Sequence, residues 1–151
     1  MIGAEIIDRR LYAGKDAAFL TLGDPTVYAT SMYIHQRIAG MGYRTSIVSG
    51  VPSFCAAAAK LGVSLGEKQE QIHIIPASYD VEAAIQLPGT KILMKAGKKM
   101  PAVRQCVKEH HGWAAMVENC GMENEHVYPD FRELDKTTGY FSLVIVKEEG
   151  K

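Results

Sequence analysis

The sequence lacks the features that mark membrane and secreted proteins. No apolar run approaches the roughly 20 residues needed to cross a bilayer, and the first ten residues have no apolar core like that of a signal peptide. Charged residues interrupt that segment instead, at Glu5, Asp8, Arg9 and Arg10. These absences predict a cytoplasmic protein without a membrane partner.

An excess of positive charge is also absent. Lys and Arg together number 17, Asp and Glu together number 17, and the formal net charge is therefore zero. Duplex nucleic acid is bound largely through Lys and Arg side chains that neutralise phosphates, and surface-bound membrane helices carry a basic face. The balance predicts that nucleic acid is not a partner.

Cysteine is scarce, and its spacing is wide. The three cysteines are Cys55, Cys106 and Cys120, with no Cys-x-x-Cys pair. Such a pattern favours small buried thiols in a reducing compartment over a disulfide or a zinc site. None of the five histidines has metal-ligand spacing with a carboxylate partner. We predict no metal held by protein side chains.

The chain does contain an alternation of strand and helix patterns. Its 151 residues are 47% apolar and 23% charged, enough for one domain with a core or for two small lobes. In the first half, a short apolar run predicts a strand at residues 17–22, and a second strand is predicted at 44–48, closed by Ser49-Gly50. Apolar residues at spacings of three and four predict a helix at 26–41 ended by Gly42, and a second helix follows Pro52 and ends at Gly62.

In the second half, strand patterns are closer together and the helices are shorter. A polar stretch at 63–71 predicts a lobe boundary near Gly66, with lobes at residues 1–66 and 67–151. Predicted strands lie at 72–75, 91–95, 113–118 and 141–146, and predicted helices at 81–87 and 101–111. The order predicts an α/β fold, with a mainly parallel sheet in the first lobe and a mixed sheet in the second.

Two small-residue loops follow the first two predicted strands. The first is Leu22-Gly23-Asp24-Pro25, where glycine permits close approach of a ligand and Asp24 can accept a hydrogen bond. Alone, it is more typical of a turn in which Asp24 caps the helix that comes after it than of a binding loop. The second loop, Ser49-Gly50-Val51-Pro52-Ser53, repeats the arrangement one unit later, so the two loops predict a shared cleft.

Two later residues occupy similar positions. Met94 lies within a predicted strand, where a methionine is usually core, although its thioether also suits contact with a purine ring. Gly121 follows the strand at 113–118 in the sequence Glu-Asn-Cys-Gly, which is a tight turn or a wall of the same cleft. Neither a phosphate-binding P-loop nor the Gly-x-Gly-x-x-Gly dinucleotide motif is present.

These four pieces, in this order, resemble the tetrapyrrole methylase family. The matching stretches are FLTLGDPTVY at 19–28, IVSGVPSFCAAAA at 47–59, KILMK at 91–95 and VENCG at 117–121. The wording of the first two resembles the branch that methylates C20 of precorrin-2 or cobalt-precorrin-2 in cobalamin biosynthesis. The resemblance covers nearly the whole chain and implies a two-lobed homodimer that binds S-adenosylmethionine and releases S-adenosylhomocysteine.

Carried over by position, the resemblance implies a set of cofactor-binding residues. They are Leu22, Gly23, Asp24 and Val27 from the first loop, Pro52 and Ser53 from the second, and Met94 and Gly121 from the other lobe. The implied reaction moves a methyl group from a sulfonium to a ring carbon, which requires placement and exclusion of water more than a nucleophile. Tyr28 and Tyr79 are weak candidates for substrate contact, and no catalytic residue is assigned.

One departure from the family pattern bears on activity. Members open with a strand and a Gly-x-Gly-Pro-Gly-Asp-Pro type loop, whereas nothing similar precedes Leu11, and residues 2–12 predict a helix. We therefore expect an N-terminally truncated member whose first strands are missing. The alternatives are a non-catalytic fragment that only folds, dimerises or binds S-adenosylmethionine, and the same fold acting on another substrate, as in diphthine synthase.

Overall fold

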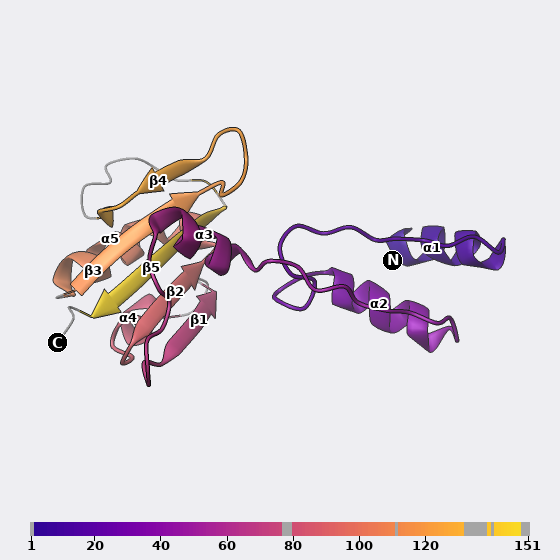
Figure 1. Ribbon diagram of the computed structural model, residues 1–151, viewed down its shortest axis with the longest axis horizontal. Helices are drawn as coiled ribbons and strands as arrows, with labels where there is room; N and C mark the ends of the chain where they lie inside the picture. Colours follow the sequence, from indigo (N-terminus) through magenta and orange to yellow (C-terminus); the bar gives the residue numbers. More distant parts are fainter. Residues whose placement is uncertain (1, 77–79, 111, 132–138, 140, 149–151) are drawn as a thin grey trace. The chain divides into compact units, whose positions relative to one another are not determined.

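A computed structural model describes residues 2–76, 80–110, 112–131, 139 and 141–148. The chain divides into two compact units, Met1–Pro52 and Ser53–Lys151 (Figure 1). Among the described residues, no helix has both the length and the apolar character that a membrane span requires. Likewise, no group of three or more His, Cys, Asp or Glu side chains in the described part could hold a metal ion.

The first unit contains a pair of packed helices. Helix α1 spans Ile2–Tyr12, as predicted, and α2 spans Ser31–Gly40, five residues shorter at its start than predicted. Their contact buries Ala4, Ile34 and Ile38, which lie on one face of each helix. Gly42 follows α2 with φ of +91°, which confirms it as the residue that ends the helix.

Two predicted strands of the first unit are wrong. Residues 17–22, an apolar run, and residues 44–48 have no strand pairing in the structure. A strand exists only where a second strand accepts and donates its backbone hydrogen bonds, and no described segment of the first unit does so. A local sequence pattern predicts that a segment is suitable for a strand, but it does not predict whether a second strand lies beside it to pair with.

The second unit is built on a five-stranded mixed sheet with the order β1-β2-β5-β3-β4. The strands are β1 (Ile72–Pro76), β2 (Thr90–Met94), β3 (Gly112–Glu118), β4 (His126–Tyr128) and β5 (Ser142–Glu148). Strands β1 and β2 are parallel, and the other neighbouring pairs are antiparallel. The mixed sheet expected for the second half of the chain is therefore confirmed.

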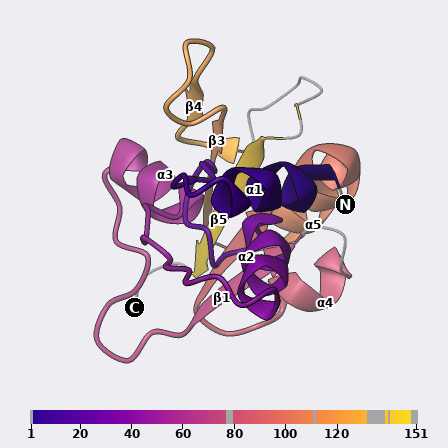
Figure 2. The ribbon, with the colours of Figure 1, turned by 90° about the vertical axis from the view of Figure 1, so that its right-hand side faces the viewer.

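Helices cover both faces of this sheet (Figure 2). Helices α4 (Val81–Ile85) and α5 (Met100–Glu109) pack on one face, where Val103 and Val107 are buried against Leu93 and Val144. Helix α3 (Ser53–Leu61) packs on the opposite face, where Ala57 and Ala58 meet residues such as Ile92, Val117 and Ile145. Both faces are covered, which explains the apolar runs Ile92–Met94 in β2 and Leu143–Val146 in β5.

Some details of the second unit depart from the sequence patterns. The three-residue strand β4 and the 3-10 helix η1 (Ala96–Lys99) were not predicted, and α4 ends at Ile85 rather than at residue 87. Helix α3, expected in the first lobe, packs on the sheet of the second unit. The lobe boundary near Gly66 stays a prediction.

One charged side chain lies in the core of the second unit. Lys91, on β2, has no solvent exposure, and alternation along the strand places it on the same face as Leu93. In the described part of the chain, its Nζ atom has no hydrogen-bond partner. Burial lowers the pKa of the Lys91 ammonium, and the carboxylates of Glu148 and Glu70 oppose that shift. A buried unpaired charge destabilises the folded state.

Replacing Lys91 with methionine is therefore expected to stabilise the chain. Lys91→Met keeps an unbranched side chain, one atom shorter, and removes the charge, so thermal unfolding at pH 7 should show a gain of about 1–2 kcal/mol. Because the folded pKa lies below the unfolded value of 10.5, wild-type stability rises as pH increases through that window. The gain in stability of Lys91→Met over the wild type should therefore become smaller as the pH rises through the same window.

The control for this comparison is Lys108→Met, at an exposed position of α5, which should change stability by less than about 0.5 kcal/mol. A lower melting temperature for Lys91→Met than for the wild type would contradict the prediction.

Candidate functional site

The first loop is organised by the carboxylate of Asp24. Its Oδ1 atom accepts hydrogen bonds from the Thr26 backbone N–H at 2.8 Å and from the Thr26 hydroxyl. Gly23, with φ of +74°, reverses the chain just before it. Asp24 was expected either to cap a helix beginning at Thr26 or to face a ligand. Because α2 begins only at Ser31, Asp24 caps a turn and not a helix.

Asp24 also joins the two loops that the sequence predicted to share a cleft. Its Oδ2 atom accepts a hydrogen bond from the Gly50 N–H at 2.9 Å. A Cβ atom at Gly50 would lie 2.2 Å from the carbonyl oxygen of Gly23, a distance that real contacts do not allow. The two loops therefore meet backbone to backbone, and only glycine fits at position 50.

These hydrogen bonds hold Asp24 in its charged form. The Thr26 hydroxyl, the Thr26 N–H and the Gly50 N–H, in that order, lower the pKa of the Asp24 carboxyl. A carboxylate offers about four acceptor positions, and three of them are taken. Asp24 therefore retains at most one acceptor position for a ligand hydroxyl or amine.

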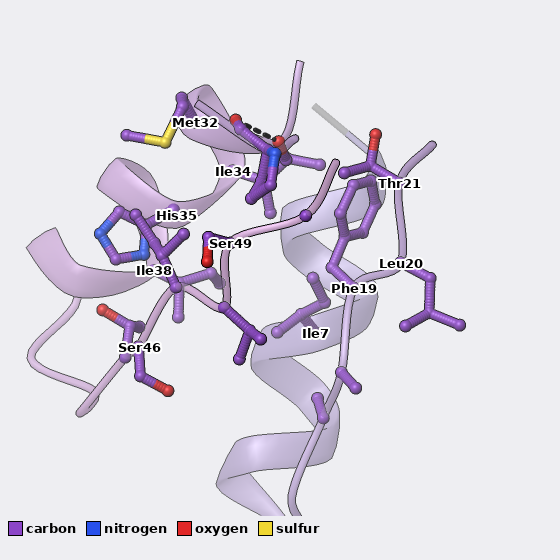
Figure 3. A pocket seen from close by; sticks show the side chains of 18 of the residues that line it. Ile7, Phe19, Leu20, Thr21, Met32, Ile34, His35, Ile38, Ser46 and Ser49 are labelled. Atoms are coloured by element: carbon purple, nitrogen blue, oxygen red, sulfur yellow. Dashed lines mark hydrogen bonds between the residues drawn. The ribbon is translucent and has the colours of Figure 1, made fainter. Parts of the chain in front are cut away.

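A cavity of about 500 Å³ lies inside the first unit (Figure 3). Residues 17–21 line it from one side and residues 44–50 from the other, and α1 and α2 complete its wall. In Figure 3, Phe19 and Leu20 lie across the cavity from Ser46 and Ser49. The cavity therefore separates the two extended segments along their length, while Asp24 and Gly50 join their ends.

In the second unit, the sheet register brings Met94 near the turn that contains Gly121. Met94 pairs with Leu143 of β5, and Leu143 pairs on its other side with Val117 of β3. Strands are about 4.8 Å apart, so the ends of β2 and β3 lie about 10 Å from each other at one sheet edge. Both strands end at that edge because each is antiparallel to β5.

The side chain of Met94 is part of the core. It is 9% exposed and packs in the cluster that α3 covers. Gly121 differs, because it is exposed with φ of +80° and no atom of the described residues lies within 4 Å of the position its Cβ would take. Gly121 therefore borders open space, whereas Met94 offers only a small part of its surface.

A carboxylate that the sequence analysis missed holds the Gly121 turn. Glu125 Oε2 accepts a hydrogen bond from the Gly121 N–H at 2.6 Å, and Glu125 Oε1 lies 3.0 Å from Lys60 Nζ. The Gly121 N–H and Lys60 both lower the pKa of the Glu125 carboxyl. Lys60 belongs to α3, far from Glu125 in the sequence, so no local spacing could have revealed the pair.

The other predicted residues are divided between the units. Leu22, at 76% exposure, and Val27, half-buried, flank the first loop. Pro52 is the last residue of the first unit, and Ser53 opens α3 in the second. Tyr28 is exposed with φ of +49°. Tyr79 lies outside the described residues.

The contact between Gly50 and Gly23 yields a prediction about the first unit. Gly50→Ala places a methyl group against the Gly23 carbonyl, which should force the loops apart and cost about 1–3 kcal/mol in urea unfolding. Gly40→Ala is the matched control, since Gly40 is in α2 with open space around it. Alanine there should be neutral or stabilise by up to about 1 kcal/mol. Equal stability of the two variants would show that the loops do not make this contact.

Comparison with known proteins identifies the family to which these loops belong. Residues 3–135 match the family of Tetrapyrrole (Corrin/Porphyrin) Methylases. The chain is 30% identical over 145 residues to the probable cobalt-precorrin-2 C(20)-methyltransferase of Methanocaldococcus jannaschii, covering 93% of this chain and 63% of that protein. It is 26% identical over 148 residues to the precorrin-2 C(20)-methyltransferase of Sinorhizobium sp, covering 95% of this chain and 60% of that protein.

A solved structure shows the same fold. Uroporphyrin-III C-methyl transferase from Thermus thermophilus, complexed with S-adenyl homocysteine, matches 96% of this chain and 71% of its own, with a TM-score of 0.73 and 16% identity. The chain spans less than two thirds of the length of the two curated relatives. Since the family match extends over most of the sequence, the chain belongs to the tetrapyrrole (corrin/porphyrin) methylase family.

Proposed function

We propose that the chain serves S-adenosylmethionine-dependent methylation of C20 of precorrin-2 or cobalt-precorrin-2 in cobalamin biosynthesis. The observation that carries the proposal is the identity, at 30% and 26% over more than nine tenths of the chain, to two proteins named as C20-methyltransferases of these substrates. The loop sequences FLTLGDPTVY and GVPSFCAAAA support the same branch of the family.

The proposed cofactor-binding residues belong to four loops or strand ends. They are Leu22, Gly23, Asp24, Val27, Pro52, Ser53, Met94 and Gly121. Two observations support this set. The Asp24 carboxylate keeps at most one acceptor position after its three internal hydrogen bonds, and Gly121 borders open space.

The residues present suit a methyl transfer that needs positioning rather than a protein nucleophile. S-adenosylmethionine supplies an electrophilic methyl group on a sulfonium. In the transfer, the methyl–sulfur bond breaks with its electron pair going to sulfur, while a ring carbon of the tetrapyrrole forms the new bond and later loses a proton. In this proposal, the hydrogen bond from the Gly50 N–H to Asp24 holds the loops that place the donor in line with the acceptor. Such placement accounts for much of the rate in reactions of this kind.

Tyrosine side chains are the proposed contacts for the substrate. Tyr28 is our candidate for tetrapyrrole contact because its ring is exposed beside the first loop, and Tyr79 is kept as a second candidate. No residue is assigned as the base that removes the proton. We also propose that the protein acts as a cytoplasmic homodimer with lobes at residues 1–66 and 67–151.

Calorimetric titration of the protein with S-adenosylhomocysteine tests the proposal directly. Binding with about one site per chain is expected, and Gly121→Ala should weaken it about tenfold or more, because a methyl group occupies the space that borders the turn. If the wild-type protein does not bind S-adenosylhomocysteine, the proposed function is wrong.

Gly62→Ala is the matched control for this titration. Gly62 lies in the same unit, has φ of +68°, and also has no atom of the described residues within 4 Å of its Cβ position. Both alanine variants should cost a similar 1–2 kcal/mol, roughly, of stability, since both require a left-handed backbone. Only Gly121→Ala should change the affinity, and an equal loss of affinity in both would argue against Gly121 as a cofactor contact.

A further inference from the structure

The turn that follows β3 contains two residues with left-handed backbone and is closed by hydrogen bonds. Asn119 has φ of +52° and Gly121 has φ of +80°. The turn is closed by the Met122 N–H, which donates to the Asn119 carbonyl at 2.9 Å, and by the Asn119 side chain, which donates to the Asn124 carbonyl at 3.3 Å. Asparagine and glycine are the residues that most readily adopt this left-handed backbone, and the hydrogen bonds made to the turn determine where Gly121 lies.

Glu125 supplies the strongest of these supports. Its carboxylate accepts the Gly121 N–H at 2.6 Å, a charge-assisted hydrogen bond. The other oxygen pairs with Lys60 at 3.0 Å, and the Glu125 side chain is only 19% exposed. The Cys120 thiol also contacts the same carboxylate. One side chain therefore joins two parts of the second unit: the turn that contains Cys120 and Gly121, and α3.

Helix α3 is itself fixed against the sheet. Ala57 is fully buried and Ala58 is 5% exposed, and both pack in the cluster that contains Met94, Val117 and Leu143. Lys60 extends from the last turn of this helix, and Ser53 forms its first residue. The Lys60–Glu125 pair thus connects a helix that begins at one proposed cofactor residue with a turn that contains another.

We propose that Glu125 is a positioning residue for the cofactor site, acting through the Gly121 turn and through Lys60 on α3. This inference rests on the proposed function, because it assumes that Ser53 and Gly121 contact the cofactor. The Gly121 N–H is already bound to Glu125, so a ligand meets the Cα and carbonyl side of Gly121. The position of that surface depends on the carboxylate that orients the peptide.

The test substitutes the carboxylate and measures binding and stability separately. Glu125→Gln keeps the shape and one acceptor oxygen but removes the charge, so S-adenosylhomocysteine should bind about tenfold more weakly by calorimetry. The amide proton of Gly121 should move upfield in the NMR spectrum, because its hydrogen bond to a neutral amide oxygen is weaker than the bond to a carboxylate. Lys60→Met, which leaves the bond to Gly121 intact, should weaken binding less than Glu125→Gln.

Glu70→Gln is the matched control. Glu70 also pairs with a lysine, Lys147 at 3.3 Å, and accepts a backbone N–H, from Glu67 at 3.1 Å. Its exposure of 21% is close to that of Glu125. However, it bonds the Thr90 hydroxyl at the start of β2, while Met94 and the Gly121 turn lie at the far ends of their strands. Glu70→Gln should therefore cost comparable stability without changing the affinity.

The outcomes separate this inference from the proposed function. Weaker binding in Glu125→Gln but not in Glu70→Gln supports the positioning role. Unchanged affinity in Glu125→Gln, or equal losses in both variants, overturns it while wild-type binding still supports the proposed function. If the wild type binds no S-adenosylhomocysteine, the proposed function is wrong. If the NMR shift of the Gly121 amide proton does not change in Glu125→Gln, the hydrogen bond on which the inference depends is wrong.

Discussion

The second unit depends on the insertion of β5 between β2 and β3. Strand β5 is the last strand among the described residues, and it pairs with residues 91–94 of β2 on one side and with all of β3 on the other. Without it, β2 and β3 would have no common neighbour, and the carboxyl ends of those two strands would not lie close together at the same end of the sheet. The alternation of Leu143 and Ile145 with Val144 and Val146 also supplies the core on both faces. The proximity of Met94 to the Gly121 turn is therefore a consequence of β5 rather than of either loop.

In the first unit, two similar segments are not joined in this way. Residues 17–22 and 44–48 were both predicted as strands, but they line opposite sides of a cavity and no described strand pairs with either. Asp24 connects their ends by accepting a hydrogen bond from Gly50. Backbone groups that are not paired in a sheet must be satisfied by water or another partner. The loop geometry thus depends strongly on one carboxylate, because the extended segments leading to it have no ladder of hydrogen bonds to align them.

The sequence predicted those elements whose signals are local, and it failed where the partner is remote. Helix ends at Gly42 and Gly62 were recognised because a left-handed residue stops a helix by its own conformation. The buried strands β2, β3 and β5 were recognised from apolar runs, but the same signal at residues 17–22 predicted a strand that has no partner. Glu125 and Lys60 were missed because their contact links a residue on α3 with a turn after β3. Lys91 was assigned only to a strand, since burial of a charge depends on packing from both helices and sheet.

The structure also distinguishes glycines that the sequence motifs treat alike. At Gly50 the missing side chain is required by the protein itself, because the Gly23 carbonyl already occupies the Cβ position at 2.2 Å. At Gly121 the corresponding space is open, and the need for glycine comes from φ of +80° alone. The sequence motifs do not reveal this difference, since each of the two glycines follows a predicted strand. Gly50 therefore lets the two loops meet, whereas Gly121 is the position at which we propose that a ligand approaches the backbone, with Glu125 holding the turn in place.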